Sequence, residues 1–277
     1  AAKRYEEAFN VIYRDNPLPS VCGRVCNHEC ETACTRTDVD GAVAIRAIKR
    51  FCADYAVDND IKPKIPLVVK KDKSIGVIGG GPSGIGCAHR LASKGYQVTI
   101  YEKNKRAGGM LAYGIPSYRL PDKYLDADLD YLKLMGVEIK TQTTVGQDIS
   151  FKEIYKANDA VYISTGLQEM AKLPQLPGSD LNGIYQGGDI LYQIRNDQPF
   201  TAKKNGVVIG GGNVAIDVAR TLNRLGAEKI TLVCLEEYDK MPAIRSEITE
   251  AENEGIIIKT GLSTSRFMGS GTDVEGI

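Results

Sequence analysis

The chain has 277 residues, 43% of them hydrophobic and 25% charged, and its 35 basic side chains balance its 35 acidic ones. This length accommodates two or three domains, and the zero net charge argues against a basic nucleic-acid surface, so no nucleic-acid partner is expected. The apolar runs are about as long as strands, far below the roughly 20 residues of a membrane span, and no span is predicted.

The N-terminus and the cysteines bear on the cellular location of the protein. The charged N-terminus lacks the apolar core of a signal peptide, and four of the seven cysteines fall within thirteen positions. This pattern fits an intracellular, cytoplasmic protein with thiolate metal ligands better than a disulfide scaffold. The chain starts without methionine and stops at Ile277 after an apparent turn, so we expect it to be a piece of a longer polypeptide.

Four cysteines recur at every fourth position near the N-terminus, and we call them the cysteine ladder: Cys22, Cys26, Cys30 and Cys34. In one straight α-helix the first and last thiols would lie about 18 Å apart, too far for a single metal centre. The segment is therefore predicted to turn around a centre, and Pro17, Pro19 and Gly23 oppose a regular helix. Even spacing favours a [4Fe–4S] cluster, with a zinc site and spare thiols as the alternatives.

The chain divides by composition into three blocks. The first is helical in pattern, with a helix predicted over 42–51, and in the second Pro63 and Pro66 favour extended backbone. From Ser74 the pattern alternates strand with helix, which predicts parallel sheets. The predicted parts are a helical metal domain (1–60), a linker (61–73), and two dinucleotide-binding domains (74–200 and 201–277).

The first glycine-rich turn, Gly79-Gly80-Gly81-Pro82-Ser83-Gly84, follows an apolar run that ends at Ile78 and opens a predicted helix over 83–94. In this motif Gly79 permits a tight turn, Gly81 lets the backbone approach a pyrophosphate, and Gly84 lets helix and strand pack closely. Gly95 ends the helix, and Glu102 follows the predicted strand 97–101. A carboxylate at this distance, 23 residues beyond Gly79, binds an adenosine ribose, so the spacing predicts a dinucleotide site.

Two elements are predicted after the first unit. Ser150 and Glu153 form a capping box that opens a helix, and the apolar run 160–163 is predicted to be a buried strand. Leu173–Asp180, with two prolines and a glycine, is predicted to be a crossover.

The second glycine-rich turn repeats the first. Gly210, Gly212 and Ala215 follow an apolar run, and the predicted helix ends at Gly226 before a strand over 229–233. The alternative to a second dinucleotide site is an empty relic of the same fold.

The residues after this second strand bear on the choice of nucleotide. When the two units are aligned, Cys234 takes the place of the carboxylate of the first unit, and Glu236 and Glu237 follow without an arginine. A 2′-phosphate needs cationic partners, whereas a free ribose hydroxyl accepts a carboxylate. NAD(H) is therefore predicted over NADP(H), although Lys240 and Arg245 lie close by in the chain.

The remaining thiols and the two histidines are assigned ordinary roles. Cys52, Cys87 and Cys234 are predicted to be buried, and His89, in the middle of a helix, is predicted to have a solvent-side or a packing role. His28 lies inside the ladder and is a candidate hydrogen-bond donor to it. The sequence contains no Cys-x-x-Cys pair, so disulfide reductase chemistry is not expected.

Four segments resemble the glutamate synthase small (beta) subunit family. Asn16–Cys26 resembles its N-terminal iron–sulfur segment, and Val43–Arg50 the helix that follows. Gly108–Pro121 is similar to its flavin-contacting loop, and Val208–Asp217 to its nicotinamide-nucleotide site. The family includes the NAD(P)H-oxidising part of glutamate synthase, the N-terminal half of dihydropyrimidine dehydrogenase, and flavin subunits of electron-bifurcating NAD(P)H–ferredoxin enzymes.

The resemblance implies an α/β, glutathione-reductase-like fold: a small helical iron–sulfur domain, then two nested Rossmann-like domains, with the C-terminal part of the FAD domain missing. It implies a [4Fe–4S] cluster on the ladder, with FAD at the first turn and NAD(H) at the second. The implied FAD-site residues are Gly79, Gly81, Pro82, Ser83, Gly84, Glu102, Lys103, Gly109, Met110, Leu111, Arg119, Thr165 and Gly166. The implied nicotinamide-site residues are Gly210, Gly212, Asn213, Val214 and Glu236. Tyr113, Tyr118 and Arg119 are candidates to tune the flavin.

The function expected from this resemblance is that of an FAD- and iron–sulfur-dependent NAD(H) oxidoreductase subunit, passing electrons to ferredoxin or a partner subunit, with electron-bifurcating enzymes included. The flavin would supply the reactive atom, so no catalytic side chain is assigned. A true glutamate synthase small subunit that feeds a glutamine-dependent catalytic subunit is one alternative. A non-catalytic structural subunit of a redox complex is the other.

Overall fold

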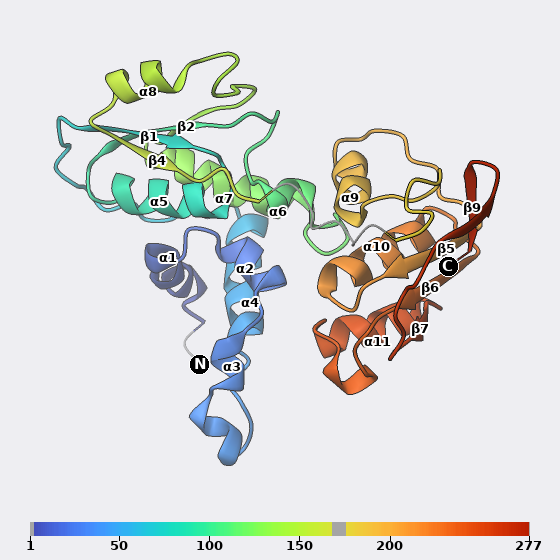
Figure 1. The fold of residues 1–277 in the computed structure, drawn as a ribbon. Helices are drawn as coiled ribbons and strands as arrows, with labels where there is room; N and C mark the ends of the chain where they lie inside the picture. The colour runs from blue at the N-terminus through green and yellow to red at the C-terminus, as the bar shows by residue number, and fades with distance from the viewer. Residues whose placement is uncertain (1–2, 168–175, 277) are drawn as a thin grey trace. The chain divides into compact units, whose positions relative to one another are not determined.

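The computed structural model describes residues 3–167 and 176–276 (Figure 1). The chain forms two compact units that divide after Gly166, and each is described by itself. Residues 173–175 of the predicted crossover lie outside the described residues. Over the described ranges, no helix has both the length and the apolar composition needed to cross a membrane.

The first unit begins with four helices around the cysteine ladder. Their bounds are α1 Tyr5–Asp15, α2 Pro19–Val25, α3 Glu29–Thr32 and α4 Ile45–Asp58, with a 3-10 turn at Thr35–Asp38 between the last two. The helix predicted over 42–51 starts three residues later and continues to Asp58. It continues because Cys52, Ala53 and Ala56 extend its buried face.

The ladder turns, as predicted, because α2 ends at Val25 and α3 begins at Glu29. Between them His28 adopts a left-handed conformation (φ 50°). Pro19 was expected to oppose a helix, but it occupies the first turn of α2, where proline is tolerated. Gly23 lies inside α2 because the backbone of α4 passes there: an added Cβ would lie 2.8 Å from the Cα of Arg50.

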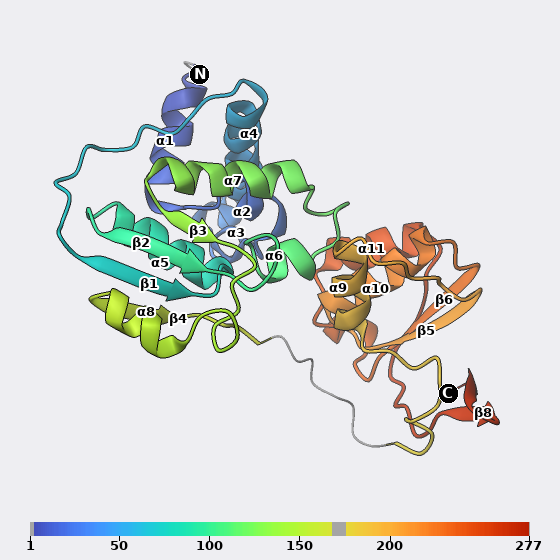
Figure 2. The same cartoon turned by 90° about the horizontal axis from the view of Figure 1, so that it is seen from above.

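The first sheet is parallel throughout, with strand order β3-β2-β1-β4. Its strands are β1 Ser74–Ile78, β2 Gln97–Tyr101, β3 Glu138–Lys140 and β4 Ala160–Ile163. Its helices are α5 Pro82–Ala92, α6 Met110–Tyr113, α7 Asp122–Leu134 and α8 Phe151–Ala157. Figures 1 and 2 show α5 and α7 on one face and α8 on the other. The predicted capping box opens α8, where the Glu153 N–H donates to the Ser150 hydroxyl over 3.2 Å.

The core of this unit continues into the N-terminal helices. Leu18 and Val21, at the start of α2, share a buried cluster with residues of the sheet, α5 and α7. Phe9 of α1 and Tyr131 of α7 meet in a second cluster with Cys52. Helices α2 and α4 therefore pack directly on α7.

One prediction about this sheet is wrong. The strand 160–163 has the predicted bounds but is largely exposed, with Ile163 62% accessible. It is the edge strand of the described sheet, pairing only with β1, so its outer side has no strand neighbour among the described residues.

The second unit holds a smaller parallel sheet of order β5-β6-β7. Its strands are β5 Asn205–Ile209, β6 Lys229–Val233 and β7 Ile257–Lys259, and its helices are α9 Gly187–Arg195, α10 Asn213–Arg224 and α11 Arg245–Asn253. A 3-10 turn at Tyr238–Lys240 precedes α11, and β8 Met268–Ser270 pairs antiparallel with β9 Asp273–Gly276. The predicted α/β class with two Rossmann-like units is confirmed, whereas the predicted domain boundaries stay predictions.

Candidate dinucleotide sites and cluster segment

In the first turn, two glycines are required by the protein's own packing. Gly79 follows β1 with φ +102°, and an added Cβ would lie 2.3 Å from the carbonyl oxygen of Ser164. A Cβ on Gly84 would lie 2.0 Å from the carbonyl oxygen of Gly79. These contacts bring β1, the start of α5 and the end of β4 together.

Each turn has one glycine, Gly81 in the first and Gly212 in the second, that is required neither by backbone conformation nor by packing. Gly81 has φ −77° and Gly212 has φ −92°, values that other residues adopt readily. A Cβ on Gly81 would make only an ordinary contact, 3.8 Å from the Cα of Gly109, and one on Gly212 would meet no described atom within 4 Å. The space that a Cβ would fill at Gly81 and Gly212 therefore lies open at the N-termini of α5 and α10, where helix amides attract phosphate.

A buried carboxylate lies beside the first turn. Glu102 is 5% exposed, and its two oxygens accept the N–H groups of Gly80 (2.8 Å) and Asn104 (2.9 Å). The Gly108 N–H donates to the carbonyl of Gly80 over 2.7 Å, which holds the predicted flavin loop against the turn. The structure thus brings the first turn, Glu102 and the 108–109 loop together.

Two side chains that support this arrangement were not predicted to do so. The Tyr113 hydroxyl accepts the Arg106 N–H (3.0 Å) and donates to the Arg106 carbonyl (3.3 Å), so it fixes the loop before α6. The Ser164 hydroxyl donates to the carbonyls of Ile78 (3.1 Å) and Gly79 (3.0 Å) and ties β4 to the turn. Neither contact can be predicted from the sequence, because tertiary packing determines which backbone groups lie near the two hydroxyls.

The other predicted residues of the first unit differ in their surroundings. Pro82 and Ser83 begin α5, where the Ser83 hydroxyl lies 2.9 Å from the Tyr162 hydroxyl. Met110 is exposed, and Leu111 is buried in the core of the unit. The remaining members lie on loops: Lys103, Thr165 and Gly166 are exposed, and Arg119 is half-buried.

The second turn has the same register. Ile209 pairs with Val233 as Ile78 pairs with Tyr101, so Cys234 does take the place of Glu102. In the second unit a carboxylate comes two residues after Cys234, from Glu236. A Cβ on Gly211 would lie 2.9 Å from Oε2 of Glu236, just as one on Gly80 would lie 3.1 Å from Oε2 of Glu102.

The predicted residue Asn213 secures a loop against this turn. Its side-chain oxygen accepts the Ile244 N–H over 2.8 Å, and the Ala243 N–H donates to the Gly211 carbonyl over 3.0 Å. Val214 beside it is exposed. The loop after β6 therefore folds back over the start of α10.

The ladder thiols occupy different environments. The His28 N–H donates to Sγ of Cys26 over 3.3 Å. Backbone N–H groups, the largest contribution coming from Val43, lower the pKa of the Cys34 thiol, whereas burial raises the pKa of Cys22. Cys30 is exposed.

Donated N–H groups favour thiolates, the form that binds iron–sulfur clusters. In the part of the chain that the structure describes, no three Cys, His, Asp or Glu side chains gather around one metal ion.

Two charged side chains anchor the ladder helix α2. Asp128 of α7 is fully buried and accepts the N–H groups of Ser20 and Val21, each at 3.1 Å. The Arg24 guanidinium lies 3.2 Å from the centre of the Tyr124 ring. A sequence signal existed for Asp128, because it interrupts the apolar stripe of α7.

Arg24 also pairs with Asp54 of α4 over 2.8 Å, so α2 is fixed to both neighbours. Of the cysteines predicted to be buried, Cys52 and Cys234 are, but Cys87 is only half-buried. Of the two roles predicted for His89, the structure shows packing: the side chain is buried, with its ring edge-on to Tyr13 at 5.2 Å.

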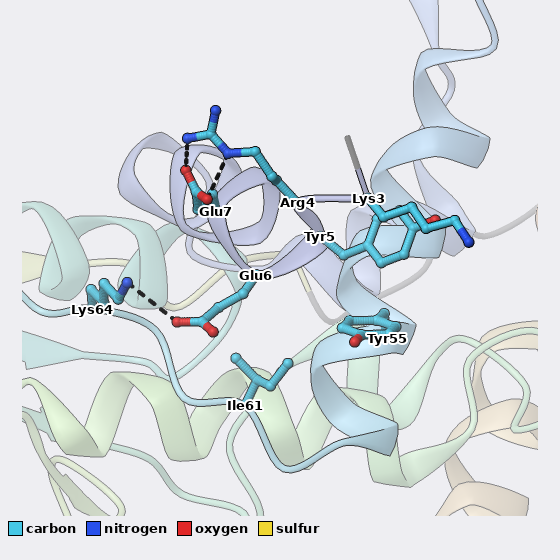
Figure 3. A pocket seen from close by; sticks show the side chains of 8 residues that line it. All are labelled: Lys3, Arg4, Tyr5, Glu6, Glu7, Tyr55, Ile61 and Lys64. Atoms are coloured by element: carbon cyan, nitrogen blue, oxygen red, sulfur yellow. Dashed lines mark hydrogen bonds and ion pairs between the residues drawn. The ribbon is translucent and has the colours of Figure 1, made fainter. Parts of the chain in front are cut away.

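A surface pocket of about 380 Å³ lies between the start of α1 and the end of α4 (Figure 3). Arg4 pairs with Glu7 on one side, and Lys64 lies 3.3 Å from Glu6 on the other. The pocket contains none of the predicted site residues.

Comparison with known proteins agrees with this geometry. The family described as "Pyridine nucleotide-disulphide oxidoreductase" matches residues 73–277. The chain belongs to this family. Residues 1–61 match the domain described as "Dihydropyrimidine dehydrogenase domain II, 4Fe-4S cluster".

Curated relatives confirm the resemblance to the glutamate synthase small subunit family. The NADPH-Fe(3+) oxidoreductase subunit beta of Geobacter sulfurreducens is 40% identical, over 91% of this chain and 38% of that protein. The NAD-dependent dihydropyrimidine dehydrogenase subunit PreT of Escherichia coli is 36% identical, over 94% and 63%. The glutamate synthase [NADPH] small chain of the same organism is 32% identical, over 92% and 57%. This family member thus spans less than two thirds of each relative.

A solved structure supports the fold alone. A variant of FprA from Mycobacterium tuberculosis matches with a TM-score of 0.63 at 18% identity, covering 74% of this chain and 63% of that one.

Proposed function

We propose that this chain carries the cofactor sites of an FAD- and iron–sulfur-dependent NAD(P)H oxidoreductase subunit. It would move electrons between a nicotinamide, a flavin and an iron–sulfur cluster, toward a partner subunit or ferredoxin. The observation that carries the proposal is the open space at Gly81 and Gly212, which neither backbone conformation nor protein packing accounts for. A carboxylate lies beside the neighbouring glycine in both turns, as a dinucleotide ribose requires.

We assign FAD to the first turn and NAD(P)H to the second. Bound FAD supplies the group that exchanges hydride with nicotinamide and releases electrons singly. The chain's own part is to bind and orient: the amides of α5 would face the pyrophosphate, and Glu102 the adenosine ribose. The 108–109 loop, fixed by Tyr113 through Arg106, would border the same cofactor.

We assign a [4Fe–4S] cluster to the ladder, supported by the N–H groups donated toward Cys26 and Cys34 and by the domain match over residues 1–61. Such a cluster supplies one-electron transfer. Within the ladder, α2 is held to α7 and α4, which would keep its thiols at a fixed place beside the first unit.

The partners follow from the relatives, several of which are named as subunits. We propose redox partner subunits in a hetero-oligomer, with ferredoxin as a second acceptor. A glutamine-dependent catalytic subunit is a further candidate partner, favoured by the 32% identity to the glutamate synthase small chain. The cytoplasmic location stays a prediction.

Matched alanine substitutions test the assignment. Gly81→Ala fills the first open space and should reduce the FAD content of the purified protein, while NAD(P)H binding at the second turn persists. Gly212→Ala should weaken NAD(P)H binding, measured by calorimetry, and leave FAD bound. Neither variant should lower the melting temperature of the cofactor-free protein through a clash, because neither Cβ meets protein atoms closer than 3.8 Å. Two variants with wild-type cofactor binding would refute the proposal, and the reverse pattern would mean that the sites are exchanged.

A further inference from the structure

Both glycine turns receive a hydrogen bond from a loop that comes later in the chain. In the first unit, the Gly108 N–H donates to the carbonyl of Gly80 over 2.7 Å. In the second unit, the Ala243 N–H donates to the carbonyl of Gly211 over 3.0 Å. Gly80 and Gly211 hold the same position, each one residue before the glycine that caps the helix of its unit. The two units therefore share this contact, although their loops differ in sequence.

The contact fixes the direction of the next amide group. A peptide unit is planar and trans, so its carbonyl and its N–H point in opposite directions. The carbonyl of Gly211 and the N–H of Gly212 belong to one peptide unit, and a bond that holds the carbonyl also holds the N–H. The Gly212 N–H therefore points away from the loop that contains Ala243, at the N-terminus of α10, where amide groups attract phosphate.

The loop of the second unit, residues 241–244, is itself held in place. Met241 and Ala243 are buried in the core of this unit. The Ile244 N–H donates to Oδ1 of Asn213, the first residue of α10, over 2.8 Å. A side-chain amide nitrogen is a donor only, so the oxygen of Asn213 is the atom that holds the loop. The first turn offers no such acceptor, because Pro82 is the first residue of α5.

We propose that Asn213 is a positioning residue for the nucleotide at the second turn. Its side-chain oxygen holds the 241–244 loop, the loop holds the carbonyl of Gly211, and this bond orients the N–H of Gly212 for the pyrophosphate of NAD(P)H. Asn213 acts through the loop and is not a catalytic residue. The inference rests on the proposed function, because it requires a dinucleotide at this turn.

Substitutions at two asparagines of α10 separate this role from general helix stability. Asn213→Ala removes the acceptor, Asn213→Leu removes it but keeps a side chain of similar size, and Asn213→Asp keeps an oxygen acceptor. Asn223→Ala is the matched control. Asn223 lies near the other end of the same helix, and its side chain donates to the carbonyl of Glu254 over 3.0 Å. The control therefore also loses one bond between a side chain and the backbone, but away from the turn.

Two measurements on the full protein with bound FAD test the inference. Hydrogen–deuterium exchange of peptides that cover residues 241–244, without nucleotide, reports the protection of the Ala243 and Ile244 N–H groups. Calorimetric titration with NADH and, separately, NADPH gives the dissociation constant. The protein is reduced beforehand and kept anaerobic, so that no hydride is transferred during the titration.

The variants should differ in both measurements. Asn213→Ala and Asn213→Leu should exchange faster in the loop and bind the nucleotide roughly three- to tenfold more weakly, as the loss of one net hydrogen bond predicts. Asn213→Asp should keep the wild-type exchange. Only exchange is compared for this variant, because its negative charge itself opposes phosphate at a helix N-terminus. Asn223→Ala should keep both wild-type values, and the FAD content should be the same in all variants.

The outcomes distinguish this inference from the function on which it rests. Wild-type protein that binds neither NADH nor NADPH would overturn both. If wild type binds, unchanged exchange or an unchanged dissociation constant in Asn213→Ala would overturn the inference alone. An equal loss of affinity in Asn223→Ala, or exchange in Asn213→Asp as fast as in Asn213→Ala, would do the same. If Asn213→Ala does not fold, Asn213→Leu decides by the same criteria.

Discussion

At the scale of single residues, Asp128 combines burial with a structural role. Its carboxylate is fully buried, yet it accepts N–H groups from Ser20 and Val21 of the cysteine-bearing helix. Burial raises its pKa to about 7, although the accepted N–H bonds act in the opposite direction. Removal from water disfavours the charged form, which is why burial dominates.

This pKa predicts how the stability of the protein varies with pH. Because the pKa in the folded state lies above the unfolded value of about 3.9, the stabilising contribution is present below the unfolded pKa and lost as pH rises through about 7. Between pH 5 and pH 8 the wild type should therefore lose on the order of 2 kcal/mol of unfolding free energy relative to Asp128→Asn, which does not ionise.

Urea unfolding of both proteins at the two pH values, with equal FAD and iron content, checks this prediction. All other titrating groups are common to the two proteins, so the difference isolates Asp128. Parallel pH profiles would contradict it.

The residues that could be predicted from sequence are those governed by local backbone rules. The first glycine turn was identifiable because two constraints fall within six positions. Gly79 has a positive φ, and Gly84 allows the start of α5 to lie against the carbonyl oxygen of Gly79. Asp128 and Ser20 lie 108 residues apart, so their contact follows only from packing. The same is true of the contacts that the Tyr113 hydroxyl makes with the backbone of Arg106.

At the scale of elements, α2 and α4 approach each other closely at Gly23. A Cβ on Gly23 would lie 2.8 Å from the Cα and 2.9 Å from the Cβ of Arg50. Both atoms belong to a helix backbone or its first side-chain carbon, so neither yields by rotation. Gly23 therefore allows α2 to lie against α4.

Two glycine-to-alanine changes in the first unit should act in opposite directions. Gly23→Ala forces α2 away from α4 and should destabilise the protein by about 1–3 kcal/mol. Gly86→Ala is the matched control: it lies inside α5, and its Cβ would meet no described atom within 4 Å. It should stabilise by about 0.4–1 kcal/mol, because alanine restricts the unfolded chain. Chemical unfolding at fixed cofactor content measures both, and equal effects would show that α2 is not packed as described.

Element bounds were predicted well where a local signal ends the element. The strand 97–101 and the capping box at Ser150 have the predicted positions. The exposure of β4 was not predictable, since an apolar run of four residues does not specify its place in the sheet. The start of α4 was missed because its N-terminal N–H is satisfied by Glu31, from a different helix.

At the scale of the whole molecule, two units with the same strand–turn–helix order present two different carboxylates. Glu102 follows its strand directly, whereas Glu236 comes two residues after the equivalent position, which Cys234 occupies. Both nevertheless lie beside the neighbouring glycine of their turn. The alignment could be made from sequence, but it left Glu236 and Glu237 equivalent, and only the folded loop separates them.

The position of Glu236 predicts the nucleotide that the loaded protein oxidises. A 2′-phosphate at the second turn would meet this carboxylate and gain no charged hydrogen bond, a difference of about 1.5–3 kcal/mol. Preference for NADH over NADPH should therefore be roughly ten- to hundredfold in kcat/KM. Replacing Leu235 and Glu236 together by arginine should shift the preference toward NADPH.

Steady-state reduction of an artificial acceptor with both nucleotides measures this preference, and Glu237→Gln is the matched control. Glu237 carries the same charge one residue later, but its carboxylate lies toward Gly261, where a Cβ would be 3.1 Å from Oε1. Glu237→Gln should therefore leave the ratio of the two kcat/KM values near that of wild type, whereas Glu236→Gln should lower it. A clear NADPH preference in the unmodified protein would refute the prediction. If Glu236→Gln and Glu237→Gln changed the ratio equally, the preference would depend on the net negative charge of the loop and not on Glu236.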